Sequence, residues 1–167
     1  MSQITVIKAK LLKGDKVEIE YLKRDKHDDA ASECSEASSI PPRKEFAEAI
    51  SKLTAHFILC CEFMPLKAIK DIKNPDPELL EKYHVSGFSI SKPGTGDEGV
   101  ILTGQKTLRS GKKVGINTPV IRFSDESPEA YEHLEILEAD IRRCEDESRK
   151  YLNGEHAPNP QQKLDLK

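Results

Sequence analysis

The feature that most constrains this chain is the order in which strand-like and helix-like segments follow one another. Strand-like runs cover residues 4–12 and 17–22, and after a helical stretch three more cover 84–91, 99–108 and 113–123. Strands thus come in blocks, a pattern typical of antiparallel sheets with helices gathered on one face. We expect an α+β fold of order ββαβββα, an antiparallel sheet of about five strands with two helices packed on one face.

Both long helices are predicted from apolar residues spaced three and four apart. The first covers about residues 43–63 and follows a Pro-Pro pair, and a short helix is expected at 77–82. In the last helix Ser127 is the expected cap, Pro128 the first helical residue, and the Asn-Gly pair at 153–154 the end. Each long helix should turn its apolar stripe toward the sheet.

Residues 24–42, RDKHDDAASECSEASSIPP, differ in composition from the rest of the chain. They hold almost no large apolar side chain, so burial cannot offset the entropy lost on ordering them. We therefore predict a mobile loop, rich in Ser, Asp and Glu, at 24–42. A chain of 167 residues suits one domain. We expect that domain to cover 1–154 and a flexible C-terminal tail to cover 155–167.

Two classes of protein are disfavoured by the sequence. No stretch approaches the run of about 18 apolar residues that spans a bilayer, and the N-terminus lacks the pattern of a signal peptide. We predict a cytoplasmic protein with no membrane partner. Cys34, Cys60, Cys61 and Cys144 show no C-x-x-C spacing, so we interpret them as reduced thiols. No metal site and no cofactor are expected.

The stretch SKPGTGDEGV contains Gly94, Gly96 and Gly99 in the G-x-G-x-x-G spacing of nucleotide-binding loops. In dinucleotide sites this loop opens a helix whose N-terminus holds the pyrophosphate, but here a second strand follows. Asp97 and Glu98 would also repel phosphate oxygens. A kinase reading fails because neither H-R-D nor D-F-G follows. We predict a turn between two antiparallel strands.

No catalytic signature remains in the chain. There is no H-E-x-x-H, no G-x-S-x-G and no Walker lysine. We interpret His56 as a histidine at the core boundary, because no Ser, Cys or Asp is tied to it by a known spacing. A binding protein without catalytic activity is therefore favoured, and an enzyme built from scattered residues is the alternative.

Charge is distributed unevenly along the chain. Residues 100–123 carry basic side chains and no acidic one, whereas 124–150 carry ten acidic residues and four basic ones. One interpretation is mutual attraction between sheet and helix. The other is a phosphate-backbone footprint on the strands, with the acidic helix facing away. The nucleic-acid hypothesis assigns the contact to these side chains: Lys106, Arg109, Lys112, Lys113 and Arg122.

The tail ends in QQKLDLK, in which the apolar pair Leu164 and Leu166 follows Gln161. This pattern resembles the C-terminal peptides by which bacterial replication proteins dock on the sliding clamp, although one leucine and a final Phe of that pattern are missing. The resemblance implies that the two leucines fill a surface pocket while Gln161 hydrogen-bonds at its rim. A plain solvated tail is the alternative.

The body of the chain also carries a resemblance. The stretches VSGFSI, EGVILTGQKTL, GINTPVIRF and YLNG resemble a group of small proteins encoded by phages and prophages of gut bacteria, over most of residues 3–154. The resemblance implies a phage setting inside a host cell and attaches no activity. We predict a non-enzymatic phage-type binding protein, accessory to DNA replication or recombination. The rival is an anti-defence inhibitor that binds a host protein through its acidic helix. The oligomeric state is left open.

Overall fold

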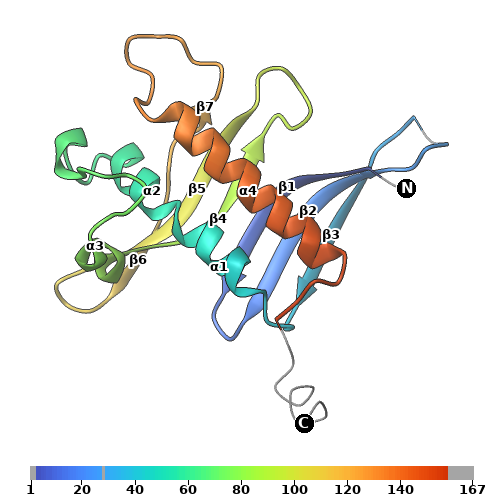
Figure 1. The fold of residues 1–167 in the computed structure, drawn as a ribbon, viewed down its shortest axis with the longest axis horizontal. Coiled ribbons are helices and arrows are strands. Elements are labelled where there is room, and N and C mark those ends of the chain that lie inside the picture. The colour runs from blue at the N-terminus through green and yellow to red at the C-terminus, as the bar shows by residue number, and fades with distance from the viewer. Residues whose placement is uncertain (1–2, 28, 158–167) are drawn as a thin grey trace.

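The computed structural model of the chain describes residues 3–27 and 29–157 (Figure 1). Within these residues one antiparallel sheet runs in the order β3-β2-β1-β4-β5-β6, and the short β7 pairs with β5 beside β6. The strands are β1 (Gln3–Leu12), β2 (Lys16–Arg24), β3 (Ser32–Ser38), β4 (Tyr83–Ser91), β5 (Gly99–Thr107), β6 (Lys113–Asn117) and β7 (Ile121–Arg122). The helices are α1 (Lys44–Ser51), α2 (Thr54–Cys60), α3 (Pro77–Lys82) and α4 (Leu134–Leu152), with a 3₁₀ turn η1 (Leu66–Ala68).

The α+β class and the antiparallel sheet predicted from the sequence are confirmed. The sheet is larger than expected, because the described chain forms seven strands where about five were predicted. The long helical stretches also differ in number, since three helices lie over the sheet and α3 lies at its end (Figure 1). No helix in the described residues is long and apolar enough to cross a membrane.

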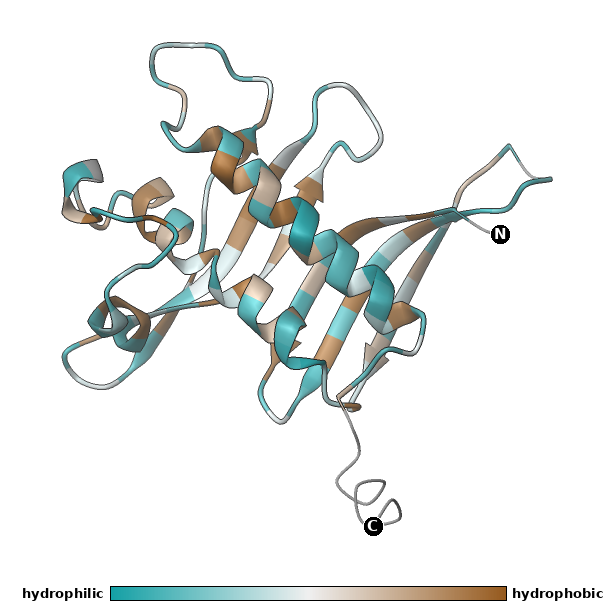
Figure 2. Ribbon diagram, viewed as in Figure 1, coloured by the Kyte–Doolittle hydropathy of each residue, from teal (hydrophilic) through white to brown (hydrophobic). Residues whose placement is uncertain are grey.

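The helices α1, α2 and α4 cover one face of the sheet, and the core lies between the two layers. Figure 2 shows brown, apolar residues along the strands that lie beneath these helices. Phe46, Phe57 and Ile141 of these helices are fully buried, as are Phe88 and Leu102 of the central strands. The opposite face carries polar side chains, including an ion pair 3.7 Å long between Lys8 and Glu20. One covered and one polar face is typical of an antiparallel sheet.

The predicted mobile loop at 24–42 was wrong for residues 32–38, which form β3. This strand pairs with β2 over seven residues, so its backbone hydrogen bonds to a neighbour although its side chains bury little apolar area. Ladder hydrogen bonds and the contact of Tyr21 Oη with Glu36, 3.1 Å away, replace hydrophobic burial as the ordering force. Composition alone cannot reveal a polar strand at the edge of a sheet.

The first predicted helix, at 43–63, is two helices. The helix breaks at Lys52 and Leu53, and α2 then buries every residue from 54 to 59 in the core. The predicted strand at 113–123 is also interrupted, because Pro119 has no N–H for the ladder. At this interruption the Thr118 side chain bonds to the neighbouring strand, because its Oγ1 accepts a hydrogen bond 2.9 Å long from the Leu102 N–H.

The predicted start of the last helix at Ser127 and Pro128 was wrong, because α4 begins at Leu134. Residues 125–130 form a turn, in which the Ser127 N–H donates to Asp125 Oδ1 at 2.9 Å. From this turn the chain runs toward α2, where the hydroxyl of Tyr131 meets a buried histidine. The polar residues expected to cap a helix are present, but their hydrogen bond stabilises a turn.

Two meanders of three strands meet at a narrow junction in the middle of the sheet. Strands β1 and β4 pair through three residue pairs, Lys8 with Ser89, Ala9 with Phe88 and Lys10 with Gly87. A bulge precedes Gly87, and a Cβ there would lie 2.1 Å from the Ala9 carbonyl oxygen. Gly87 therefore allows the two halves of the sheet to join.

Candidate functional site

The G-x-G-x-x-G loop forms the predicted turn between two antiparallel strands, β4 and β5. Gly94 has a φ of +76°, and a Cβ on Gly99 would meet β7, 2.9 Å from the Ile121 carbonyl oxygen. No helix begins at these glycines, and the Gly94 N–H donates to the carboxylate of Glu98 at 2.9 Å. The amide that would face a phosphate is thus bonded to an acid of the same loop.

A buried polar network links α2 to α4 and to the segment between β7 and α4. His56 is fully buried, its Nδ1 lies 2.8 Å from Tyr131 Oη, and its Nε2 lies 2.9 Å from Asp140 Oδ2. A carboxylate accepts hydrogen bonds, so Nε2 donates to Asp140, and in the neutral ring Nδ1 accepts from the Tyr131 hydroxyl. The interpretation of His56 as a boundary histidine was wrong, because its ring lies inside the core.

This Tyr-His-Asp order resembles a proton relay, but each polar group in it is already bonded to another member. Both nitrogens of His56 are engaged, and no part of its ring reaches the surface. Burial is the main cause that raises the pKa of the Tyr131 phenol far above its ordinary value, so the hydroxyl keeps its proton at neutral pH. The network therefore fixes Tyr131 in place and offers no free base.

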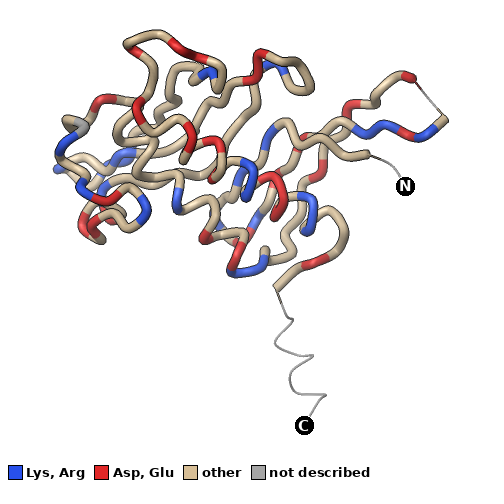
Figure 3. The backbone as a smooth tube through the Cα atoms, turned by 45° about the horizontal axis from the view of Figure 1, so that its top comes forward, with Lys and Arg blue, Asp and Glu red and all other residues tan. Residues whose placement is uncertain are grey.

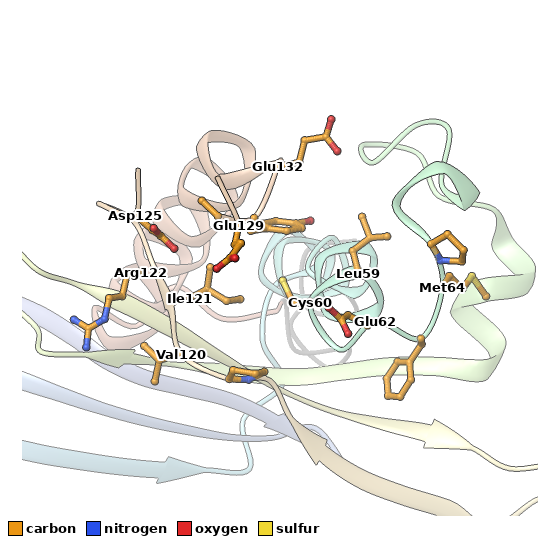
Figure 4. Close-up of a pocket in the computed structure, with 15 residues that line it drawn as sticks. Leu59, Cys60, Glu62, Met64, Val120, Ile121, Arg122, Asp125, Glu129 and Glu132 are labelled. Atoms are coloured by element: carbon orange, nitrogen blue, oxygen red, sulfur yellow. The ribbon is translucent and has the colours of Figure 1, made fainter. Parts of the chain in front are cut away.

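Tyr131 lines a pocket of about 790 Å³ at the edge of the sheet, beside β7 (Figure 4). One wall comes from the end of α2 and the turn that follows it, and the other from residues 119–132. The pocket lining mixes polar side chains with apolar ones, among them Leu59, Met64 and Ile121. The volume lies in the range of about 300–1,000 Å³ that ligand pockets occupy.

The charged side chains around the pocket are mostly acidic. Glu62, Asp125, Glu129 and Glu132 line it together with one basic residue, Arg122. In Figure 4 the carboxylates of Glu62 and Glu129 come from opposite walls, while the Arg122 side chain points away. Arg122 is ion-paired with Asp97. Glu62, Glu129 and Glu132 form no ion pair within the described residues, so the pocket carries uncompensated negative charge.

Cys60 also lines the pocket, but its environment disfavours the reactive thiolate. Burial raises the pKa of Cys60 to about 12, and burial raises the pKa of Cys61 and of Cys144 as well. The thiolate is the nucleophile, so a thiol with a raised pKa reacts slowly at neutral pH. Cys34 is half-buried on the edge strand β3.

We therefore expect iodoacetamide to alkylate Cys34 first when the native protein is treated at neutral pH. Mass spectrometry of timed samples should show one rapid modification, and Cys34→Ser should abolish that phase. Unfolding in denaturant supplies the control, because all four thiols should then react at similar rates. Labelling of Cys60 as fast as Cys34 would contradict the structural role of the pocket thiol and favour a catalytic one.

Basic and acidic residues alternate along much of the backbone (Figure 3), and the five predicted nucleic-acid contacts lie in different surroundings. Arg109 and Lys112 lie at the exposed tip of the β5–β6 hairpin, and Lys113 begins β6. Lys106 extends over aromatic rings, with Nζ 5.1 Å from the Phe63 centroid. Arg122 lies at the other end of β5, because it pairs with Gly99. The structure thus keeps Arg109, Lys112 and Lys113 together at the hairpin turn, directs Lys106 over the rings of Phe63 and Tyr83, and separates Arg122.

The charged residues of the acidic helix pair with one another and with Glu98 of the β4–β5 loop. Arg142 contacts Glu145 at 3.0 Å and Glu98 at 2.9 Å, and Arg149 contacts Asp146 at 2.8 Å. None of the described acidic residues forms an ion pair with the hairpin cations Arg109, Lys112 or Lys113. Attraction between the helix and these strands therefore does not account for the basic hairpin.

The remaining predicted site residues, Gln161, Leu164 and Leu166, lie outside the described residues. Across residues 3–27 and 29–157, no three His, Cys, Asp or Glu side chains converge as they would around a metal ion. Comparisons of the chain with protein-family profiles, curated proteins and solved structures found no match.

Sequence reasoning missed both the buried network and the pocket. Tyr131 and Asp140 lie 75 and 84 residues from His56 in the chain, so no motif of fixed spacing connects them. The signal that pointed there was the apolar environment of His56 in a helical stripe, since a histidine buried at such a position needs two polar partners. Only the fold supplies those partners.

Proposed function

We propose that this chain is a binding protein without catalytic activity of its own, accessory to DNA replication or recombination in a phage setting. The supporting observation is the β5–β6 hairpin, whose cations Arg109, Lys112 and Lys113 form no ion pair with any described residue. The hairpin is closed by a hydrogen bond 2.8 Å long from the Leu108 N–H to the Lys112 carbonyl. A rigid, protruding basic turn suits contact with a phosphate backbone.

The arrangement of the other charges supports the same proposal. The acidic residues at 124–138 lie beside β7, at the opposite end of β5 from the hairpin tip. A phosphate that approaches the hairpin tip therefore meets Arg109, Lys112 and Lys113 before it meets the acidic segment.

The absence of catalysis in this proposal rests on the buried network and on the pocket thiol. His56 has no free nitrogen, and burial raises the pKa of Cys60 to about 12. Neither group is available as a base or nucleophile at neutral pH.

We expect the triple variant Arg109→Ala, Lys112→Ala and Lys113→Ala to weaken binding to a fluorescent DNA oligonucleotide by about tenfold or more at low salt. The slope of log affinity against log salt should fall by about 2–3, since each lost phosphate contact removes about one unit. Fluorescence anisotropy at several salt concentrations measures both quantities.

The matched control removes three exposed lysines elsewhere, Lys13, Lys16 and Lys52, and should leave the slope nearly unchanged. A wild type that binds neither DNA nor RNA at low salt would reject the nucleic-acid proposal and leave the anti-defence inhibitor as the leading account. A contact of the tail with a bacterial sliding clamp through Gln161, Leu164 and Leu166 stays a separate prediction from the sequence. Calorimetry with the tail peptide tests it.

A further inference from the structure

The acidic pocket beside β7 is not used in the proposed function, and its chemistry specifies an unusual occupant. Its lining includes the apolar side chains of Leu59, Met64 and Ile121, which suit a hydrocarbon group, while three of its carboxylates form no ion pair among the described residues. Desolvating those carboxylates without a cation would be costly. A fitting occupant therefore carries an apolar side chain and positive charges close together.

The chain itself displays a segment with this combination at the tip of the β5–β6 hairpin. Leu108 is 40% exposed, which is high for a leucine, and Val114 is 41% exposed on the same hairpin. Arg109 and Lys112 flank the leucine in the turn, where Gly111 adopts a φ of +80°. An apolar side chain between two cations complements a pocket that combines apolar side chains with carboxylates.

The hairpin cannot fill the pocket of its own chain. The pocket reaches from β7 to Phe63, whose ring lies 5.1 Å from Nζ of Lys106 at the base of the hairpin. The tip lies beyond Thr107, where the ladder with β5 directs the hairpin onward along the strand. This ladder holds the hairpin, so its tip cannot turn back into the pocket.

We propose that the acidic pocket binds the β5–β6 hairpin tip of a second copy of this chain, with Leu108 against its apolar side chains and Arg109 and Lys112 at the carboxylates. Tip and pocket are different surfaces of one chain, so the contact is heterologous and repeats head to tail. Such contacts give either a closed ring or a growing filament.

This assembly goes beyond nucleic-acid binding and does not depend on it. The hairpin cations bind one ligand at a time, because a phosphate backbone and a neighbour's carboxylates compete for the same side chains. Nucleic acid that occupies the hairpin should therefore release the neighbour. The small size of the contact implies weak association, in the micromolar to millimolar range.

The test is sedimentation velocity of the full chain between about 10 μM and 1 mM, at about 50 mM salt and again at about 500 mM. We expect the mean mass to rise with concentration at low salt and to return to the monomer at high salt. The pocket variant Glu129→Gln with Glu132→Gln, and the hairpin variant Leu108→Ser, should each raise the dissociation constant at least tenfold. Both substitutions are at exposed positions, so the fold should survive.

Mixing the two variants sharpens the test. The Leu108→Ser chain keeps an intact pocket and the pocket variant keeps an intact hairpin, so an equimolar mixture should form dimers and nothing larger. A wild type that stays monomeric at the highest concentration, or a pocket variant that assembles like the wild type, would overturn the proposal. Binding of DNA separates the two proposals, because Leu108→Ser should keep it fully if the hairpin contacts phosphate.

Discussion

Gly87→Ala is expected to lower the free energy of unfolding by at least about 3 kcal/mol, the upper end of what overpacking usually costs. The added Cβ would lie 2.1 Å from the carbonyl oxygen of Ala9 and 2.9 Å from the Cα of Lys10. Both are backbone atoms, so the strain can be relieved only by separating β1 from β4. That junction has three residue pairs, and it joins the two halves of the sheet.

Thermal unfolding followed by circular dichroism measures this effect. In a chain of this length each kcal/mol shifts the melting temperature by about 2–4 °C, so a drop of about 6–12 °C is expected. Gly115→Ala is the matched control, since Gly115 also lies in a strand but has nothing within 4 Å of a Cβ. If the two variants melt together, the close approach of β1 and β4 at Gly87 is not a constraint on the fold.

The sheet was predictable to the extent that its strands alternate apolar and polar side chains. The runs now seen as β1, β2, β4 and β5 combine β-branched or aromatic residues with a buried side, and their places in the chain were predicted within a few residues. In contrast, β3 has almost no apolar side chain, and its order comes from pairing with β2. Pairing between strands cannot be recognised from the local composition of one of them.

The starts of helices were harder to predict because the same residues close turns. Ser127 and Pro128 are residues typical of a helix start. In the structure the Ser127 N–H donates to the Asp125 carboxylate, and the segment forms a turn. Tyr131 follows this turn and contacts His56 of α2, and α4 begins three residues later, at Leu134. The hydrogen bond between Tyr131 and His56 is a contact between distant segments, so local sequence rules do not include it.

Of the two candidate surfaces, the sequence predicted one and missed the other. The basic hairpin is contiguous in the chain, so the sequence predicted most of it, and the structure removed Arg122 from the group. The acidic pocket is lined by two segments about 60 residues apart in the chain, 59–65 and 119–132. No sequence pattern in either segment predicts a pocket. Sites assembled across a sheet edge become visible only when the fold is known.

The buried network should be the second major determinant of stability. We expect His56→Leu to lower the free energy of unfolding by about 2–6 kcal/mol, because it leaves the Tyr131 hydroxyl and the Asp140 carboxylate without a partner at about 1–3 kcal/mol each. Tyr131→Phe removes one hydrogen bond and should cost about 1–3 kcal/mol. Chemical denaturation with urea measures both variants.

The double variant His56→Leu with Tyr131→Phe gives the sharper result. Replacing both partners of a buried hydrogen bond by apolar groups leaves one fewer orphaned polar atom, so its cost should be smaller than the sum of the two single costs by about 1 kcal/mol or more. His84→Leu is the matched control, because His84 is exposed on the polar face of β4 and should tolerate the change. Additive costs in the double variant would show that His56 and Tyr131 do not act together. In that case the segment between β7 and α4 would be held by its other contacts, and the pocket wall that Tyr131 forms would owe its position to packing and not to the buried histidine.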